Sequence, residues 1–391
     1  MPLLQVVHFT WKGIQKPDTM GKRKVHIRLL VVGILSAAFV VILFLLSENE
    51  VHRNNAFVRR YPQYPVLNKY DLPIKFDSYY MVGYDNGKLY LGNTTAPLHL
   101  LEVDIKTRDT AHIRIELDVT DLPFRSVNIK FHSPYFFVMD GAIPFVFRGR
   151  IGDWKANLWM KDKAYFDKAI PIDTNRLYIN TVSAQTHMRT LGHLVKHDDF
   201  KIVLNTGILE KQIDGVFDVD GIMAVSPNHR TLGYIYFYRN QFLLMDPDLQ
   251  LIKRQNTIDT VQKAQIKLVE TNTKGETEMK APPLVVNRMA SIYNDLLLIN
   301  SNRLGKYELE SMLKEASIID VYNWKKGSYE FSFYIYNIDN KSIKEFSVHD
   351  QYLMALIGDE LSIYELTEKY FGKYPSYQDP QKTNTKNPNM E

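Results

Sequence analysis

The chain has 391 residues, 45% hydrophobic content, a formal net charge of +4 and no cysteine. This length allows one large domain or two ordinary ones beside a short apolar segment. The absence of cysteine excludes disulfides, thiolate nucleophiles and cysteine-type zinc sites. Residues 1–28 carry a charge of +5 and the remainder carries −1, so no basic nucleic-acid-binding domain is expected and nucleic acid is not a predicted partner.

The first predicted element is an uncharged apolar run of 18 residues, Leu29 to Leu46. A helix rises about 1.5 Å per residue, so this run nearly crosses a bilayer core of about 30 Å. The basic residues before it determine the predicted orientation, with the N-terminus in the cytoplasm. They are Lys22, Arg23, Lys24 and Arg28.

The run is longer than a usual signal-peptide core, and no small-x-small cleavage site follows it, so an uncleaved anchor is expected. Because a eukaryotic secreted domain of this size usually carries disulfides, the lack of cysteine favours a bacterial host. The predicted location is therefore the bacterial inner membrane, crossed once, with the C-terminal domain in the periplasm.

The anchor divides the chain into five predicted segments. They are a cytoplasmic segment at 1–28 with Met20 as a second candidate start, a transmembrane helix at 29–46, a spacer at 47–56, a β-propeller domain at 57–366 and a disordered tail at 367–391. The tail is predicted from its richness in Pro, Asn, Gln and Thr.

A turn followed by a short aromatic or aliphatic strand recurs six times after the spacer. Equivalent positions are 41 to 64 residues apart, and the longest gaps contain insertions at 271–283 and 304–316, the second predicted to hold a short helix. Without the insertions each unit has about 40–55 residues, the length of a four-stranded propeller blade. We therefore predict an all-β, six-bladed β-propeller preceded by a single N-terminal transmembrane helix. Two stacked β-sandwiches are the alternative.

The sixth unit reaches the end of the ordered sequence before its outer strand. The segment Ala56–Arg60 is predicted to supply that strand, because pairing the two ends of the chain removes an exposed sheet edge.

Several stretches of the repeats resemble one family. The stretch from Tyr79 to Leu101, together with Phe217–Gly221, Tyr236–Phe242 and Asn256–Thr260, is similar to membrane-anchored, six-bladed TolB-like propeller proteins of Bacteroidota. The resemblance covers roughly residues 57–366. It implies the propeller fold and a periplasmic location. It implies no catalytic residues, because no activity is established for this group.

Two sets of charged residues are candidate ligand-binding groups. Asp214, Asp218 and Asp220 lie among glycines, where they could bind calcium or hold a general base, although turns require the same residues. Arg148, Arg150 and Arg189 lie near aromatic strands and could form an anion site in a central channel, although charges at sheet edges follow the same pattern.

Two histidines are weaker candidates for a metal site. His187 and His193 are close enough in sequence to share a ligand, but ordinary surface or core histidines follow the same pattern. No catalytic residue and no cofactor is predicted.

The resulting functional prediction is a non-enzymatic scaffold that binds a protein, peptide or envelope component beside the inner membrane. The alternative is a propeller enzyme of the lactonase, dehydrogenase or hydrolase type, with a metal or cofactor in its central channel.

Overall fold

The computed structural model describes residues 19–51, 55–119, 121–270 and 277–372. They belong to two units, one within residues 1–54 and one that starts at Asn55. The first unit holds helix α1 (Thr19–Val51), whose side chains are described from Lys24 to Leu45. That stretch has a mean hydropathy of 2.7 and none of it is buried, so its length and composition fit a membrane span or a signal peptide.

The predicted transmembrane run lies within α1, and the helix extends beyond it at both ends. The four orientation residues, Lys22, Arg23, Lys24 and Arg28, all belong to α1. Residues 47–51, expected as part of a spacer, continue the helix instead. No proline occurs between Thr19 and Val51, so no proline ends the helix where the apolar run stops.

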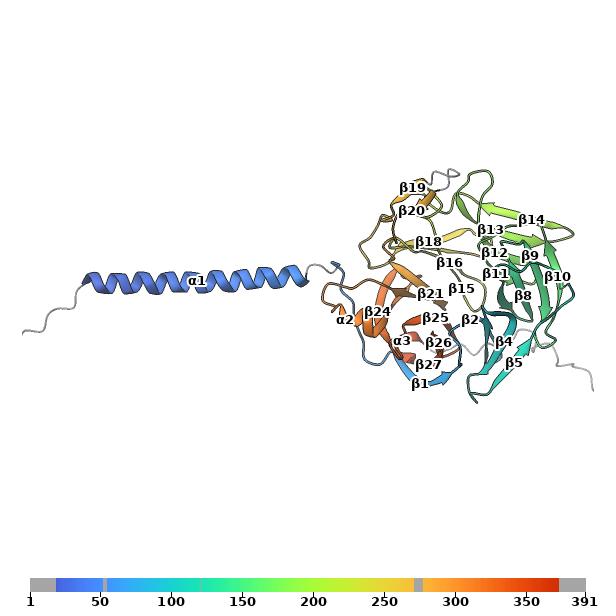
Figure 1. Ribbon diagram of the computed structural model, residues 1–391, viewed down its shortest axis with the longest axis horizontal. Helices are drawn as coiled ribbons and strands as arrows, with labels where there is room; N and C mark the ends of the chain where they lie inside the picture. Colours follow the sequence, from blue (N-terminus) through green and yellow to red (C-terminus); the bar gives the residue numbers. More distant parts are fainter. Residues whose placement is uncertain (1–18, 52–54, 120, 271–276, 373–391) are drawn as a thin grey trace, which may run out of the picture. The chain divides into compact units, whose positions relative to one another are not determined.

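The second unit is a six-bladed β-propeller (Figure 1). The first three blades each consist of four consecutive antiparallel strands, and a short strand, β6 (Glu116–Leu117), adds in parallel to the rim of blade 2. Blade 1 contains β2 (Tyr79–Asp85), β3 (Lys88–Asn93), β4 (Ala96–Asp104) and β5 (Thr110–Arg114). Blade 2 contains β7 (Asn128–His132), β8 (Tyr135–Asp140), β9 (Phe145–Arg150) and β10 (Lys155–Lys161). Blade 3 contains β11 (Lys168–Asp173), β12 (Arg176–Val182), β13 (Arg189–Lys196) and β14 (Phe200–Asn205).

The other three blades follow the same plan. Blade 4 contains β15 (Gly221–Val225), β16 (Leu232–Tyr236), β17 (Gln241–Met245) and β18 (Leu251–Asn256). Blade 5 contains β21 (Asn287–Tyr293), β22 (Leu296–Ser301), β23 (Ala316–Asn323) and β24 (Ser328–Tyr336). Blade 6 contains β25 (Ile343–His349), β26 (Tyr352–Ile357), β27 (Glu360–Leu366) and β1 (Val66–Pro73). The two predicted insertions hold the hairpin β19 (Leu268–Glu270) and β20 (Thr277–Met279) and the helix α2 (Ser311–Glu315).

The innermost strands form a closed ring around a central channel. In order around the ring, β2, β7, β11, β15, β21 and β25 each neighbour the next, and β25 neighbours β2. This arrangement excludes the alternative of two stacked sandwiches. We call the side where these strands begin the start face and the opposite side the end face.

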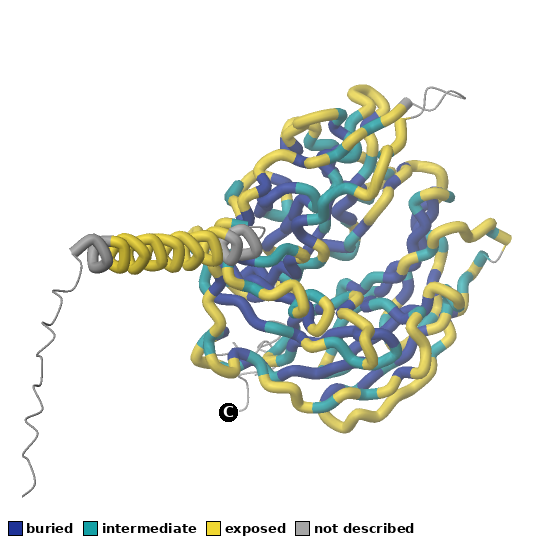
Figure 2. The backbone as a smooth tube through the Cα atoms, turned by 60° about the vertical axis from the view of Figure 1, so that its left-hand side comes forward, coloured by how far each residue is buried: buried dark blue, intermediate teal, exposed yellow. Residues whose placement is uncertain are grey.

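Six apolar clusters form the core, one between each pair of neighbouring blades. Strand β12 shows why the inner strands have continuous apolar sequences. Leu177 and Ile179 pack towards blade 2, whereas Tyr178 packs towards blade 4. Because both faces of each inner strand are covered, both must be apolar. Figure 2 shows the buried residues inside the ring and the exposed ones along its rim.

The ring is closed by pairing the N-terminal and C-terminal parts of the unit. The prediction that Ala56–Arg60 supplies the closing strand is wrong. Strand β1 pairs with β27, from Val66 opposite Leu366 to Pro73 opposite Glu360. The segment Ala56–Arg60 belongs to no strand and lies along blade 5, where the Ser332 N–H donates to the Arg60 carbonyl at 2.8 Å. It turns Phe57 and Arg59 inward, and both are buried.

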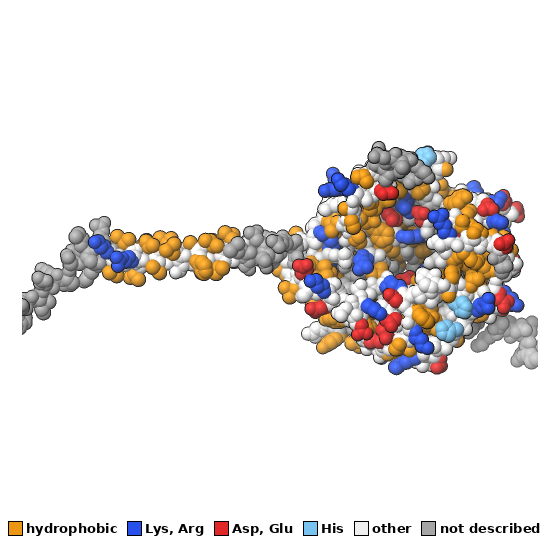
Figure 3. Space-filling model, in the orientation of Figure 1, with side chains coloured by type: hydrophobic (Ala, Val, Ile, Leu, Met, Phe, Trp, Pro, Cys, Tyr) orange, Lys and Arg blue, Asp and Glu red, His pale blue; other side chains and the backbone are white. Residues whose placement is uncertain are grey.

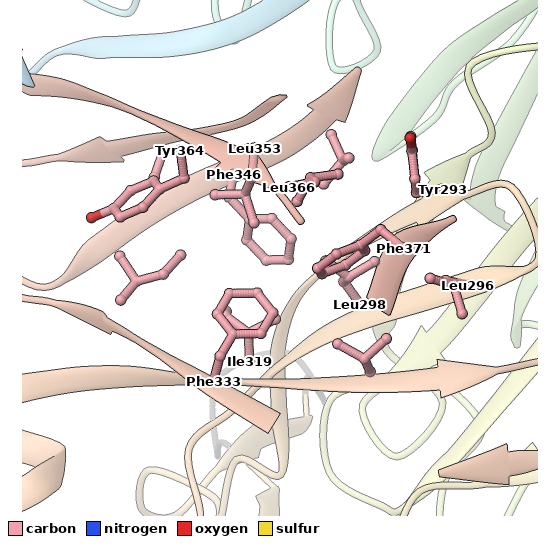
Figure 4. Close-up of a cluster of buried hydrophobic side chains, with 14 of the residues drawn as sticks. Tyr293, Leu296, Leu298, Ile319, Phe333, Phe346, Leu353, Tyr364, Leu366 and Phe371 are labelled. Atoms are coloured by element: carbon pink, nitrogen blue, oxygen red, sulfur yellow. The ribbon is translucent and has the colours of Figure 1, made fainter. Parts of the chain in front are cut away.

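The predicted disordered tail also begins too early. Helix α3 (Glu368–Phe371) follows blade 6, and Phe371 is buried between blades 5 and 6 against Phe333 and Leu298 (Figure 4). One aromatic side chain thus ties the end of blade 6 to the core. The rest of the predicted tail, 373–391, lies outside the described residues.

Candidate functional site

An open groove lies on blade 2 and faces blade 3. It has a volume of about 540 Å³ and is lined by Tyr135, Arg148, Gly149, Arg150, Asp153, Lys155 and Asn157. Alternation along β9 explains the lining. Phe145 and Phe147 pack towards blade 1, so Arg148 and Arg150 project from the opposite face of the strand.

Arg148 is held in place but keeps hydrogen-bonding capacity. One of its amino groups donates to the Thr174 carbonyl at 2.6 Å and to Asn175 Oδ1 at 3.0 Å, both in the turn between β11 and β12. Its guanidinium group lies 5.0 Å from the Tyr135 ring centre and 5.8 Å from that of Trp159. Its Nε and second amino group have no hydrogen-bond partner among the described residues.

Two other basic side chains of the groove, Arg150 and Lys155, are more exposed than Arg148. Arg150 is exposed and has neither a hydrogen bond nor an ion pair from its side chain to any described residue. Lys155 is 3.5 Å from Glu116, but both side chains are largely in water, so this ion pair is weak.

Two aromatic rings connect this groove to blade 3. The ring centres of Trp159 and Phe200 are 4.9 Å apart, and Lys196 Nζ lies within 5.8 Å of both. We use "basic groove" for the surface formed by Tyr135, Arg148, Arg150, Lys155, Trp159, Lys196 and Phe200. Arg148 and Lys196 lie over aromatic rings of this groove, and its four cations can bind carboxylate or phosphate groups.

Two of the acidic candidates, Asp214 and Asp218, accept hydrogen bonds from their own loop. Asp218 is buried and accepts hydrogen bonds from the backbone N–H groups of residues 212–215, at distances from 2.5 to 3.2 Å. Burial favours a higher pKa for Asp218, but hydrogen bonds with Asp214 and from these N–H groups lower it. Asp214 accepts from the N–H groups of residues 216–218 in the same way. Both carboxylates therefore shape the loop, as turn residues do.

The third aspartate, Asp220, lies beside the third arginine, Arg189, at the start face. Arg189 Nε is 3.8 Å from Asp220, and the Arg189 guanidinium also donates to Asp167 at 2.5 Å and to the Val216 carbonyl at 3.2 Å. Lys168 beside them donates to the Gly221 carbonyl at 3.0 Å, and burial lowers the pKa of Lys168. Figure 3 shows basic and acidic side chains intermixed around the hollow in the middle of one face.

The three arginines therefore do not form the single channel site that the sequence predicts. Arg148 and Arg150 share the basic groove, whereas Arg189 belongs to the acidic and basic cluster at the start face. Deeper in the channel, Lys130 donates to the Met81 carbonyl at 2.7 Å, and Glu345 accepts from the Met81 N–H at 2.8 Å. These two charged groups satisfy backbone groups of the inner strand β2.

The two histidine candidates differ in position and in burial. His187 is in a turn with a positive φ of 54°, whereas His193 is buried in β13. Burial and the nearby charge of Arg176 lower the pKa of His193 to about 4. Within residues 24–45 and the described part of the propeller, no group of three His, Asp or Glu side chains is arranged to hold a metal ion.

Three other histidines line the end face of the channel, and the sequence did not reveal them as a group. His132, His229 and His349 come from blades 2, 4 and 6, and the rings of the first two are 4.3 Å apart. Burial lowers the pKa of all three, to about 3 for His229 and about 4 for His349. The charges of the other two histidines lower that of His229 further. All three are therefore neutral at pH 7.

Comparisons with known proteins identify no family. No protein-family model matches the chain, and no curated protein matches it. Distantly similar solved structures include virginiamycin B lyase from Staphylococcus aureus, with 10% identity over 76% of this chain and 99% of that chain and a TM-score of 0.45. BamB from Moraxella catarrhalis has 10% identity over 77% of this chain and 100% of that chain, with a TM-score of 0.41. The β-propeller domain of Cps50 (Swd1) from Myceliophteria thermophila has 8% identity over 76% and 100%, with a TM-score of 0.44.

Proposed function

We propose that this protein is a non-enzymatic binding scaffold whose basic groove holds carboxylate groups of a protein or peptide partner. The observation that carries the proposal is the unused hydrogen-bonding capacity of Arg148 and Arg150. Neither forms an ion pair with a described carboxylate, although ion pairs hold Arg59, Arg176, Arg189, Arg254 and Arg303. A guanidinium group binds a carboxylate through two parallel hydrogen bonds, which gives this groove its selectivity.

We further propose that the scaffold is anchored in a bacterial inner membrane and meets its partner on the periplasmic side. The apolar run of α1, the basic residues before it and the resemblance to TolB-like propellers of Bacteroidota support this location. A periplasm-dependent reporter fused after Glu391 is expected to be active. Activity of a cytoplasm-dependent reporter at the same position would contradict the orientation.

The binding proposal is tested with the full-length protein in detergent micelles and a fluorescein-labelled hexaglutamate peptide. Charge-assisted hydrogen bonds contribute about 1.5–3 kcal/mol each, so replacing Arg148 and Arg150 with glutamine should weaken binding roughly tenfold or more. Binding should also weaken steeply between low and physiological salt.

The matched control replaces two exposed arginines elsewhere on the propeller, Arg230→Gln with Arg288→Gln. This variant has the same net charge as the groove variant, so it should keep wild-type affinity. Equal loss in both variants would show a nonspecific charge effect, and undetectable binding to the wild-type protein would disprove the proposed function.

A further inference from the structure

Each blade of the propeller ends in an outer strand, and an uncovered outer strand offers unpaired N–H and C=O groups to another chain. Five of the six outer strands are protected among the described residues. The rim strand β10 of blade 2 is paired with β6, and Asp118 accepts a hydrogen bond from the Leu158 N–H at 2.9 Å. The rim strand β24 of blade 5 is covered by the segment that contains Arg60.

In the remaining three protected strands, residues of the strand itself or beside it block pairing at the outer edge. Strand β1 follows Pro65, ends at Pro73 and carries charged residues in its middle. Strand β18 carries Lys253 and Arg254 in its middle. Strand β5 is only five residues long and ends with Arg114. Prolines, charges and shortness are the usual means by which proteins block edge-to-edge pairing.

Strand β14 of blade 3 carries one charged residue, Lys201, next to its first position, and has neither a charge nor a proline at its centre. No described residue pairs with its outer edge, and it reads Phe-Lys-Ile-Val-Leu-Asn. Ile202 and Val203 are 41% and 45% exposed, although they occupy the centre of the strand. Among the described residues, its two ends contact neighbouring blades: Phe200 lies against Trp159 of blade 2, and Asn205 Nδ2 donates to the Leu249 carbonyl at 3.0 Å.

The basic groove begins where β14 begins. Phe200 is the first residue of β14 and contacts Trp159, which in turn lies under Arg148. Ile202 pairs with Leu194, a residue of the cluster between blades 2 and 3, so Ile202 faces the same side as the groove. Strands β10 and β14 both lie on the rim of the ring (Figure 1). An exposed apolar edge thus continues into the cations of the basic groove.

We propose that β14 receives an extended peptide segment as a fifth, antiparallel strand of blade 3, with the acidic end of that segment in the basic groove. This inference rests on the proposed function and names the partner of the same site. Every neighbouring strand in blade 3 is antiparallel. An antiparallel peptide reaches the Phe200 end with its C-terminal part, so its apolar β-branched residues come first and its carboxylates follow. Backbone hydrogen bonds supply affinity and the cations select the sequence.

The test compares two peptides of the same composition, Val-Thr-Val-Thr-Val-Glu-Glu-Glu and its reversed sequence, on full-length protein in micelles. The first is expected to bind at least about tenfold more tightly than both the reversed peptide and hexaglutamate, because only it places strand and carboxylates together. N-methylation of alternate residues refines the test. Only one of the two alternate sets of N–H groups faces β14, so only one of the two methylated peptides should lose this advantage.

Variants of the strand provide the second measurement. Ile202→Asn with Val203→Asn should reduce the affinity for the first peptide to that for hexaglutamate. The matched control, Leu251→Asn with Ile252→Asn, changes two similarly exposed apolar residues of β18 and should have no effect. Melting temperatures of both variants establish that the propeller remains folded.

The outcomes separate this inference from the proposed function. Equal affinity for the two peptide orders, with binding still dependent on Arg148 and Arg150, overturns strand addition and leaves the scaffold proposal standing. Failure of all the peptides to bind overturns both. A dimer in sedimentation that is lost in the Ile202 and Val203 variant also overturns the inference, because a second copy of the chain would then occupy β14.

Discussion

Arg59 and Arg148 place the same chemical group in opposite settings. All five N–H donors of Arg59 are used, by Asp320 twice and by Glu308, Ser301 and the Arg303 carbonyl. Its side chain is fully buried. Arg148 uses one amino group and keeps the rest of its guanidinium available. A buried arginine whose donors are all used holds the fold together, whereas a surface arginine with unused donors is able to recognise a ligand.

The largest expected effect is a loss of stability when the buried Arg59 is replaced. Burial opposes the charge of Arg59, yet Asp320 and Glu308 raise its pKa above the usual value, so the group is charged and paired. Arg59→Met removes the cation that neutralises two carboxylates in a buried site and should reduce the free energy of unfolding by about 3–5 kcal/mol. Urea unfolding of the full-length protein in micelles measures the loss.

Two further variants refine that measurement. The combined change Arg59→Met and Asp320→Asn should recover part of the loss, because one unpaired charge is removed. Arg60→Met is the control, since Arg60 is exposed and bonds Tyr329, and it should cost less than about 1 kcal/mol. A loss below about 1 kcal/mol for Arg59→Met would show that its contacts do not support the fold.

A smaller effect concerns the histidines of the end face. The folded protein keeps His229 neutral down to a pKa of about 3, whereas an unfolded chain protonates histidine from about pH 6.5 downward. Protons therefore bind the unfolded state preferentially, and stability falls as the pH is lowered from about 6.5 towards 4. His229→Asn should remove about 1–2 kcal/mol of that acid sensitivity, and asparagine tolerates the positive φ of 56° at this position.

Melting temperatures between pH 7 and pH 4.5 measure this effect. His197→Asn, at an exposed turn, serves as the control and should leave the pH profile unchanged. Parallel profiles for the wild-type protein and His229→Asn would show that burial of this ring does not oppose its protonation.

The smallest expected effect is on stability when Arg148 and Arg150 are replaced. Arg148→Gln with Arg150→Gln should change the free energy of unfolding by no more than about 0.5–1 kcal/mol, because the lost contacts are few and partly in water. The same urea unfolding experiment measures it. Destabilisation as large as that of Arg59→Met would remove the distinction between structural and recognition arginines.

The blade count was predictable because each unit repeats one pattern, an apolar strand after a tight turn. The closing strand was not, because local sequence favours the wrong segment. Ala-Phe-Val-Arg-Arg has the side chains of a strand, while Val66–Pro73 contains Asn, Lys, Asp and Pro. Tertiary pairing with β27 outweighs that local preference. The signal for the true role of Arg59 was Asp320, a lone acid within the apolar sequence Ile-Ile-Asp-Val.

The candidate site was predictable only in part. Arg148 and Arg150 lie on one face of β9 and could be identified, but Lys196 and Phe200 of blade 3 join them only when blades 2 and 3 come together. The end-face histidines had a signal that alignment of the repeats would have found. His132, His229 and His349 all lie at or beside the first turn of alternate units, so the ring brings them to one mouth.

The pairing of β1 with β27 also has a consequence for biosynthesis. The two strands that close the ring include residues 300 positions apart, Val66 and Leu366. A ribosome makes β1 before any complete blade and β27 after all the others, so β1 must remain without its partner throughout synthesis. Such long-range closure is slow and leaves an unpaired strand exposed to other chains meanwhile. The ring therefore closes only after residue 366 has emerged.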